Sequence, residues 1–456
     1  MDDWHVKILG TANIAQLMVR YCVPTMLATS IQACYNIVDR IFVGRVCGED
    51  ALAAVTVCFS PQLLFLAISM MIGQGSAALL SIKLGQKDYS GASRVFSQAA
   101  LLFVLFYIGA LCILMPFMRE ILEFFGATPK IVDDAQAYYT IIVFGLIFEK
   151  ISFGINNLIR AEGRPAYAMS TMFVGALSNI ILDYVFMCVF DMGVRGAAYA
   201  TVAAQALGSV WVMLFYAGGR SCLTFRLSDV KFHRDIIGAV CSAGSPSLIM
   251  QLLAGLGVSL YVKQACEFGS ESTIAIVGVD FASTTIMFMP VVGLSMGVQP
   301  IIGYNWGARN PERVVKTFYY ALAAATAFCT LAFVLAQLYA EVIFMLFFGE
   351  TSSLITDGAR IMRILVCCTP FIGANIVASG FFQSTKRPAY SVAVTFIRQA
   401  LFLIPLLYLL PIYFGLDGLW ASFPLSDFMA FLVTLVFILL KITPARVEAD
   451  IRSLKT

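Results

Sequence analysis

The sequence predicts an all-α polytopic membrane protein of twelve transmembrane helices, arranged as two parallel repeats of six. Three observations lead to this prediction. The 456 residues are 60% hydrophobic and 12% charged, whereas soluble domains carry about 25% charged residues. Apolar runs long enough to cross a membrane recur from one end of the chain to the other. Landmark residues of the first half recur at a constant spacing in the second half.

Twelve apolar windows lie between charged or Gly- and Pro-containing breaks. Each window is long enough to cross a hydrocarbon core of about 30 Å as a helix. The windows exceed strand length and do not alternate in polarity, so a β-barrel is disfavoured. The expected spans are residues 18–44, 51–82, 95–117, 134–158, 167–190, 196–217, 236–264, 272–303, 314–340, 356–381, 390–414 and 417–441.

An internal duplication relates the two halves of the chain. Pro24 and Pro246 are 222 residues apart, and Gly75 and Gly297 repeat that spacing. The stretch "GRPAYAM" at 163–169 likewise corresponds to "KRPAYSV" at 386–392. One such pair would be chance, but agreement across the whole half indicates a duplication. Because each half holds an even number of spans, both halves enter the membrane from the same side and the repeats are parallel.

We therefore expect a first lobe at residues 1–219, a cytoplasmic linker at 220–235 and a second lobe at 236–456. Most of the 30 Lys and Arg residues fall in segments that share a side with the N-terminus. The positive-inside rule then puts both termini in the cytoplasm of a cell that holds the chain in its inner membrane. The N-terminus has no basic stretch followed by a short apolar run, so a cleavable signal peptide is not expected.

Several classes of function are disfavoured. The net charge of +3 and the lack of basic runs argue against a nucleic-acid partner. The twelve cysteines lie mostly in apolar segments without a C-x-x-C pair, and His5 and His233 are far apart, so neither a zinc site nor a cofactor is expected. The sequence lacks H-E-x-x-H and G-x-S-x-G, which leaves an intramembrane enzyme as an unfavoured alternative. Two parallel six-helix lobes suit a transporter that works by alternating access.

Five acids lie deep in apolar spans, where a charge costs about 2.5–3.5 kcal/mol. Such residues usually face a cavity or a partner, so they are candidates for function. They are Asp39, Glu149, Asp183, Asp280 and Asp427.

Asp39 and Asp183 are expected at similar heights, because the spans that carry them both run outward and both acids lie in the outer part. Tyr35 and Gln32 precede Asp39 by four and seven residues, on the same helical face. Asn179 precedes Asp183 by four residues, and Thr201 lies early in the next span. We expect a polar cluster of Asp39, Tyr35, Asn179, Asp183 and Thr201 in the first lobe.

The repeat adds an argument about the role of these acids. At the spacing of 222 residues, Asp39 corresponds to Tyr261 and Asp183 to Pro405, so the second half lacks both. This asymmetry favours a specialised role over a scaffolding role. A structural alternative remains open, in which each acid neutralises a nearby base such as Arg40 or Arg195. Glu149 and Lys150 balance each other in one interpretation, and Glu149 or Lys150 interacts with Arg398 in another.

The sequence resembles the MATE family, the multidrug and toxic compound extrusion transporters, and in particular its DinF-like branch. The resemblance covers essentially the whole chain and rests on five segments taken in order. These are "NIVDRIFVG" with "EDALAAV", "GQGSAALLSIKLGQKD", "EGRPAYAM", "SNIILDYVF" with "GVRGAAYAT", and "VGLSMGVQPIIGYNWGARNPERV". It implies a V-shaped pair of six-helix lobes that export organic cations or amphiphiles by antiport against H⁺ or Na⁺.

The resemblance also implies functional residues. The ion-coupling site of that branch falls on Asp39, Asn179, Asp183 and Thr201, which would also be the ligands if the coupling ion is Na⁺. Gln32, Tyr138 and Asn156 are looser matches for a substrate cavity. Another branch has an acid in span 7, where this chain has Gln251, so Asp280 and Asp427 are the candidates for a second-lobe site.

We expect cationic or amphiphilic small molecules and membrane lipids as the partners of a monomeric transporter. A protonated Asp39 would lose its attraction for a cationic drug, which would couple proton entry to export. A flippase for lipid-linked or oligosaccharide substrates has a similar outline and is the alternative within transport. It would require a larger and more basic cavity, whereas Lys150 and Arg398 are the clear deep bases of this sequence.

Overall fold

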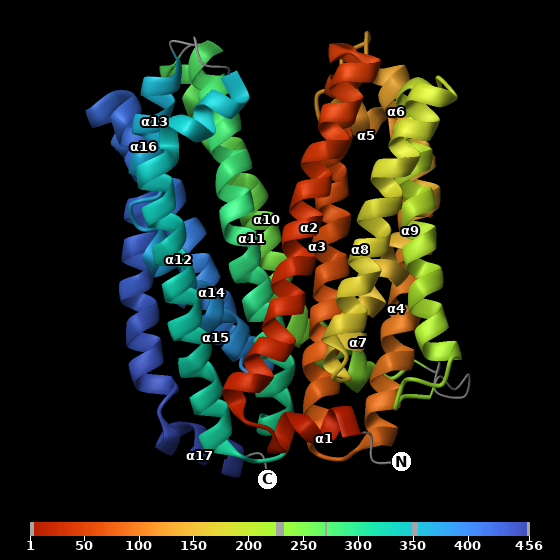
Figure 1. The fold of residues 1–456 in the computed structure, drawn as a ribbon, viewed down its shortest axis with the longest axis vertical. Coiled ribbons are helices and arrows are strands. Elements are labelled where there is room, and N and C mark those ends of the chain that lie inside the picture. The colour runs from red at the N-terminus through yellow and green to blue at the C-terminus, as the bar shows by residue number, and fades with distance from the viewer. Residues whose placement is uncertain (1–3, 225–231, 270, 349–353, 454–456) are drawn as a thin grey trace. The chain divides into compact units, whose positions relative to one another are not determined.

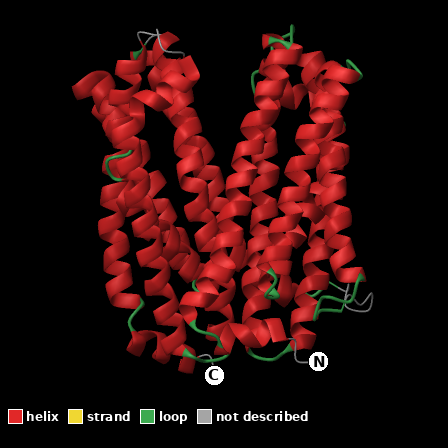
Figure 2. Cartoon of the chain, viewed as in Figure 1, coloured by secondary structure: helices red, strands yellow, loops and turns green. Residues whose placement is uncertain are grey.

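The computed structural model describes residues 4–224, 232–269, 271–348 and 354–453. Within these ranges every regular element is a helix and there is no strand (Figure 2). The helices, shown in Figure 1, are α1 (Trp4–Thr11), α2 (Ile14–Cys47), α3 (Glu49–Gly85), α4 (Tyr89–Leu114), α5 (Met118–Phe124), α6 (Val132–Glu149), η1 (Lys150–Ile155), α7 (Asn156–Ala161), α8 (Pro165–Asp183), η2 (Tyr184–Val189), α9 (Gly193–Ala217), α10 (Arg234–Phe268), α11 (Glu271–Gly307), α12 (Pro311–Phe348), α13 (Leu354–Leu365), α14 (Thr369–Ser384), α15 (Pro388–Phe396), η4 (Ile397–Leu403), α16 (Ile404–Lys441) and α17 (Pro444–Ser453).

All twelve expected spans are present as helices. Ten helices of the described chain are long and apolar enough to cross a membrane, and α13 with α14 forms an eleventh span that is bent by 47°. The helical run 388–441 contains two of the expected spans. The chain breaks between them at Gly415, which has φ 58° and ψ −140°. Only glycine adopts that conformation readily, so this residue separates the last two spans and brings the total to twelve.

Three short helices were not expected from the sequence. They are α1, α5 and α17, of eight, seven and ten residues. Each is too short to cross a bilayer, so a search for long apolar windows misses them. α1 and α17 each turn two apolar side chains inward, with Val6 and Leu9 buried in α1 and Val447 and Ile451 buried in α17.

The chain forms two compact units, and it passes from one unit to the other inside the helices α2 and α10. The first unit is Met1–Ala12 with Leu27–Leu248, and the second is Asn13–Met26 with Ile249–Thr456. Each unit therefore contains the start of the long helix that mainly belongs to the other unit. The crossings lie next to Pro24 in α2 and Pro246 in α10, the equivalent positions of the two repeats. The linker predicted at 220–235 lies partly outside the described residues.

Two equivalent glycines allow these helix starts to pack closely. In the first unit, a Cβ on Gly75 of α3 would lie 2.2 Å from the carbonyl oxygen of Val240 in α10. In the second unit, a Cβ on Gly297 of α11 would lie 2.4 Å from Thr25 Oγ1 and 2.8 Å from the Cα of Cys22 in α2. Both contacts bring one backbone against another, which only a residue without a side chain permits. The internal repeat therefore extends to the packing of the first helix of each half.

Candidate functional site

Three π-helical stretches among the described helices lie beside charged residues of the apolar spans. η1 begins at Lys150, directly after Glu149. η2 begins directly after Asp183, and η4 includes Arg398 as its second residue. A π-helical turn widens the backbone and is frequent at functional sites. The π-helical stretches therefore lie at or next to residues that stand out in the sequence because they are charged and deep in apolar spans.

Asp39 of α2 and Asp183 of α8 meet inside the first unit. The two carboxylates lie close enough to interact electrostatically. Asp183 is fully buried, and its Oδ1 also accepts a hydrogen bond of 3.5 Å from Asn179 Nδ2. The Oδ1 of Asn179 has no hydrogen-bond partner in the described part of the chain, so it remains available to a ligand. The arrangement is a pair of carboxylates with an adjacent amide oxygen.

Two tyrosines border this pair. The carboxylates of Asp39, Asp183 and Glu149 act electrostatically on the half-buried Tyr35. Asp39, Asp183 and Tyr35 act in the same way on the buried Tyr138 of α6. The structure therefore brings Tyr35, Asp39, Tyr138, Asn179 and Asp183 together. This cluster, called the first-unit acidic cluster below, contains four of the residues predicted for the first lobe and Tyr138.

The remaining predicted residues are placed differently. Thr201 is half-buried in α9, the helix that packs against α8. Gln32 and Gln251 are half-buried in α2 and α10. Asn156 is buried and donates a 3.0 Å hydrogen bond from Nδ2 to the carbonyl of Ala168, which joins α7 to α8. Asn156 therefore has a packing role whatever else it does.

The structure resolves the partners of the deep bases that the sequence left open. Lys150 is fully buried and its Nζ lies 3.1 Å from Glu149 Oε2, so these neighbours balance each other. Arg398 belongs to the second unit, where its Nε lies 2.6 Å from Asp427 Oδ1. Each of these bases therefore has its partner within its own unit. The side chain of Arg40, another possible counter-ion, lies outside the described residues.

The acids of the second unit sit in different surroundings. Asp427 has its counter-ion in Arg398. Asp280 is 2% exposed, and neither of its carboxylate oxygens has a hydrogen-bond partner among the described residues. It acts electrostatically on Tyr261, the residue that corresponds to Asp39 in the repeat. Tyr261 in turn packs edge-on against Phe281, Trp420 and Phe423. Asp280 thus lies at the edge of an aromatic core.

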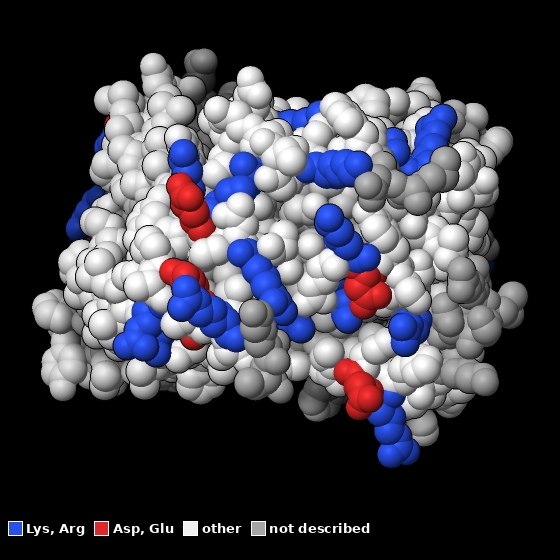
Figure 3. All heavy atoms as spheres, turned by 90° about the horizontal axis from the view of Figure 1, so that it is seen from below, with Lys and Arg blue, Asp and Glu red and all other residues white. Residues whose placement is uncertain are grey.

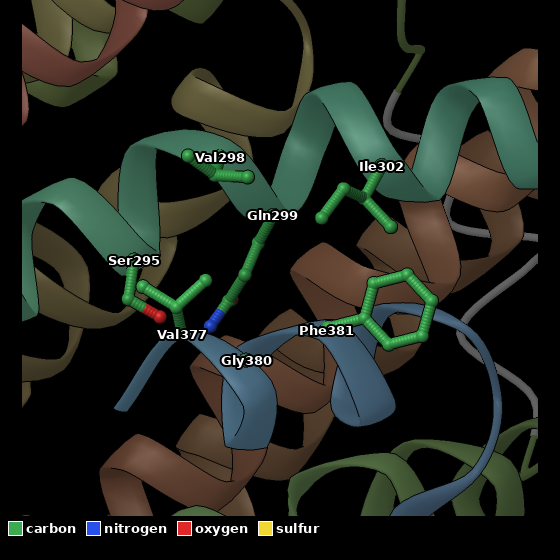
Figure 4. A pocket seen from close by; sticks show the side chains of 7 residues that line it. All are labelled: Ser295, Val298, Gln299, Ile302, Val377, Gly380 and Phe381. Atoms are coloured by element: carbon green, nitrogen blue, oxygen red, sulfur yellow. The ribbon is translucent and has the colours of Figure 1, made fainter. Parts of the chain in front are cut away.

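The second unit also contains a small pocket (Figure 4). It is enclosed by α11 and α14, and its polar side chains are Ser295 and Gln299. Gln299 Nε2 donates a 3.4 Å hydrogen bond to Gln383 Oε1, which spans the two helices. The remaining lining residues are Val298, Ile302, Val377, Gly380 and Phe381. Without a charged side chain, this pocket offers nothing specific to a cation.

The first-unit acidic cluster supplies oxygen ligands that suit a sodium ion. No group of three or more His, Cys, Asp or Glu residues lies close enough to hold a metal ion in the part of the chain that the structure describes. Two carboxylates and the free Asn179 Oδ1 nevertheless supply the hard oxygen donors that an alkali cation prefers. The same groups can hold a proton, so the geometry accommodates either ion.

The sequence profile of the MatE family matches this chain twice, over residues 24–185 and 246–409. The chain belongs to the MatE family. The two matches begin 222 residues apart, which is the spacing of the repeated landmarks. The MatE profile therefore describes one repeat, and each half of this chain contains a copy.

Individual MatE relatives cover the whole chain. The multidrug export protein MepA of Staphylococcus aureus (strain N315) is 21% identical over 446 residues, which are 96% of this chain and 97% of that protein. MepA of Staphylococcus saprophyticus is 21% identical over 448 residues, with the same coverage. A crystal structure of MATE in the bent conformation is 23% identical, covers 100% of both chains and superposes with a TM-score of 0.91. A structure titled as the outward-facing conformation of a multidrug resistance MATE family transporter gives the same values.

These likenesses decide the class of protein. The chain is a multi-pass membrane transporter of the multidrug efflux family and not an enzyme. Its fold is the twelve-helix, two-lobe fold of the solved MATE structures. An intramembrane enzyme is thereby excluded. Family membership does not decide the coupling ion or the substrates, which depend on the chemistry of the site.

Proposed function

We propose that this MatE protein exports cationic or amphiphilic small molecules in exchange for protons, and that the first-unit acidic cluster couples the two movements. The observation that carries the proposal is that the buried carboxylate of Asp183 lies beside that of Asp39 inside an apolar lobe. Two neighbouring carboxylates repel each other strongly if both are ionised. One proton bound between them relieves that repulsion, so the pair titrates as a unit.

Loss of that proton changes what the cluster attracts. With both carboxylates ionised, the cluster is a concentrated negative charge inside an apolar lobe, and a cation is the natural neutraliser. With a proton bound, that attraction falls. Proton and organic cation therefore compete for the same charge, which is the requirement for antiport. The neighbouring rings of Tyr35 and Tyr138 add surfaces that favour a cation.

The proton gradient supplies the driving force. Exchange of one monovalent cation for one proton moves no net charge, so each unit of pH difference contributes about 1.4 kcal/mol. A second proton per cycle would add about 2.3 kcal/mol for each 100 mV of membrane potential.

We further propose that the chain works as a monomer in the cytoplasmic membrane with both termini inside the cell. The face on the side of the termini shows many Lys and Arg side chains and fewer Asp and Glu side chains (Figure 3). This bias is what the positive-inside rule predicts for a cytoplasmic face.

The proposal is tested with purified protein in liposomes that contain ethidium. We expect an imposed pH gradient to drive ethidium transport by the wild type. Asp39→Asn and Asp183→Asn should slow that transport at least tenfold, because an amide neither takes up nor releases a proton in this range. Asp134→Asn is the control, because it removes the same charge from an exposed site at the start of α6. Gradient-driven transport by Asp39→Asn at the wild-type rate would overturn the proposal.

The same vesicles separate the alternatives. If transport ignores the pH gradient but disappears without a sodium gradient, the cluster holds Na⁺ and not H⁺. If ethidium is not transported and a fluorescent lipid-linked saccharide changes leaflet, the protein is a flippase.

A further inference from the structure

Two adjacent cysteines lie in the turn between α13 and α14 of the second unit (Figure 1). Cys367 and Cys368 are the only neighbouring pair among the twelve cysteines of the sequence. Both are free thiols, and their Sγ atoms lie 3.7 Å apart. Cys367 is exposed and Cys368 is half-buried. A small reagent can therefore reach the first sulfur directly and then find the second sulfur beside it.

The backbone around the two thiols is fixed on both sides. Successive side chains point to opposite faces of a strand and about 100° apart around a helix, so adjacent thiols seldom meet. Here the amide of Cys367 donates a 3.2 Å hydrogen bond to the carbonyl of Ile364 at the end of α13. The amide of Phe371 in α14 donates a 3.0 Å hydrogen bond to the carbonyl of Cys368. The two sulfurs thus meet at a hydrogen-bonded turn, where the span bends by 47°.

The helices on either side of the turn are anchored to other helices of the second unit. In α13, Arg363 Nε donates a 3.2 Å hydrogen bond to the carbonyl of Gln337 in α12, and Gln337 Nε2 donates one of 2.8 Å to the carbonyl of Arg363. In α14, the Phe371 ring packs 5.4 Å and 4.8 Å from the rings of Phe428 and Phe431 in α16. The turn is therefore preorganised, so a ligand that bridges the thiols orders little additional chain.

The spacing of the sulfurs suits a bridge by one larger atom better than a direct bond. The Cα atoms of adjacent residues are about 3.8 Å apart, whereas those of disulfide-bonded cysteines are usually about 4.4–6.8 Å apart. A disulfide between neighbours is therefore strained. Two thiolates on one tetrahedral zinc ion, each at about 2.3 Å from the metal, are about 3.8 Å apart. The observed 3.7 Å is close to that spacing.

The number of ligands at the turn selects among the atoms that could bridge the sulfurs. A protein zinc site usually needs four ligands, or three and a water molecule. In the part of the chain that the structure describes, no group of three or more His, Cys, Asp or Glu residues could hold a metal ion. A trivalent arsenic atom that carries one organic group has only two bonds left to make, and it favours sulfur. Two adjacent thiols satisfy it completely.

We propose that Cys367 and Cys368 form a binding site for monosubstituted trivalent arsenicals of the type R–As(OH)₂. Each thiol replaces one hydroxyl group on the arsenic. Two As–O bonds break and two As–S bonds form, and each thiol proton leaves with a hydroxyl group as water. The arsenic stays trivalent and the sulfurs stay reduced, so the step needs no oxidant or reductant. The site is independent of the first-unit acidic cluster and of the proposed exchange.

The experiment treats the purified full-length protein in detergent with phenylarsine oxide, which takes the R–As(OH)₂ form in water. An excess of glutathione then removes arsenic that is held by a single cysteine. We expect the mass of the intact wild-type chain to show one retained phenylarsenic group, which the dithiol 2,3-dimercaptopropanol should remove. Loss of the whole adduct to glutathione would overturn the proposal.

Digestion of the same wild-type adduct locates the arsenic without any substitution. Cleavage by trypsin after Arg363 and Lys386 releases the fragment 364–386, which contains Cys367 and Cys368 and no other cysteine. We expect the glutathione-resistant arsenic on this fragment. Resistant arsenic on any other fragment would contradict the assignment.

Serine variants test whether both thiols are required. Cys367→Ser and Cys368→Ser should each lower the glutathione-resistant adduct at least tenfold, because one remaining thiol cannot close the ring. Cys266→Ser is the matched control, because it removes an exposed single thiol from α10 of the same unit. It should retain the adduct within twofold. Ethidium transport within twofold of the wild type shows that the serine variants are folded. A resistant adduct of wild-type amount in Cys367→Ser would overturn the proposal.

Discussion

The Nε of Arg398 donates a hydrogen bond of 2.6 Å to Oδ1 of Asp427 in the second unit. The aspartate is 3% exposed, whereas the arginine side chain retains 27% of its surface. An isolated carboxylate at this depth is strongly disfavoured, so the arginine compensates most of the charge of Asp427. Removal of the arginine would therefore leave an uncompensated charge inside the second unit.

We expect Arg398→Met to lower the free energy of unfolding by about 2–3 kcal/mol, because it leaves the buried Asp427 without its counter-ion. The double variant Arg398→Met/Asp427→Leu should recover most of that loss, since no unpaired charge remains. Thermal unfolding in detergent measures both. The matched control is Arg360→Met, which breaks an ion pair with Asp417 whose side chains are 65% and 60% exposed. Its effect should be much smaller, and an equal effect would contradict the interpretation.

A second prediction concerns pH and the segment after α9. Glu162, between α7 and α8, is buried and accepts hydrogen bonds of 2.6 Å from Ser221 Oγ and 3.1 Å from Cys222 N. Burial raises the pKa of this carboxyl from 4.5 to about 7, although those hydrogen bonds lower it in part. The folded protein therefore binds this proton more tightly than the unfolded chain does.

The sign of the pH dependence follows. The contribution of Glu162 to stability is greatest below pH 4.5, falls as the pH rises towards 7 and is constant above it. The slope is at most about 1.4 kcal/mol per pH unit. Glu162→Gln keeps an acceptor oxygen but does not titrate, so we expect its thermal unfolding to lack this slope. The measurement is the unfolding temperature of both proteins from pH 5 to 8. An identical slope in the variant would assign the effect to another group.

A third prediction uses the equivalent glycines of the two repeats. Gly75→Ala and Gly297→Ala each place a methyl group within 2.4 Å of an atom of the neighbouring helix. We expect each to destabilise the protein by about 1–3 kcal/mol, the range for overpacking. Gly238→Ala in α10 is the control, because a Cβ there meets nothing within 4 Å. Alanine favours a helix over glycine, so this variant should be neutral or slightly more stable in the same unfolding assay.

The fourth prediction concerns Asp280. A carboxyl group that is buried without a hydrogen bond or counter-ion is expected to be a neutral acid. Asparagine is neutral and of the same shape, so Asp280→Asn should change stability by less than about 1 kcal/mol and leave ethidium transport within twofold. Asp280→Ala, which removes atoms from the aromatic core, should be less stable than Asp280→Asn. A tenfold loss of transport in Asp280→Asn would instead give this residue a part in coupling.

The helices were predictable because the length and composition of each apolar run indicate by themselves that it lies in a membrane. A run such as 89–114 has to be helical in a membrane, whatever lies beside it, since only a helix satisfies its own backbone groups there. The same reasoning predicted that Asp39 and Asp183 lie at one height, because helix direction and rise fix depth. It also placed Tyr35 on the face of Asp39, four residues away along one helix.

The lateral contacts were not predictable in this way. A span has a known depth but an unknown neighbour, so Arg398 could be assigned to an acid in either half before its contact with Asp427 was seen. Tyr138 was a looser match in the sequence, and the packing of α6 is what brings it beside the aspartate pair. Glu149 and Lys150 are neighbours in the chain, but only the fold decides that the ammonium is fully buried while part of the carboxylate stays exposed.

Composition and periodicity were sufficient to establish twelve spans, a duplication and a set of acids too costly to be incidental, because each of these depends on the chain and the bilayer alone. Packing decided which side chains surround each acid. It placed Asp39 beside Asp183, gave Asp427 a counter-ion and left the carboxylate of Asp280 without a hydrogen-bond partner among the described residues. The physical reason is that the state of a buried charge depends on the few groups within hydrogen-bonding distance. In this protein those groups come from helices that are far apart in the sequence.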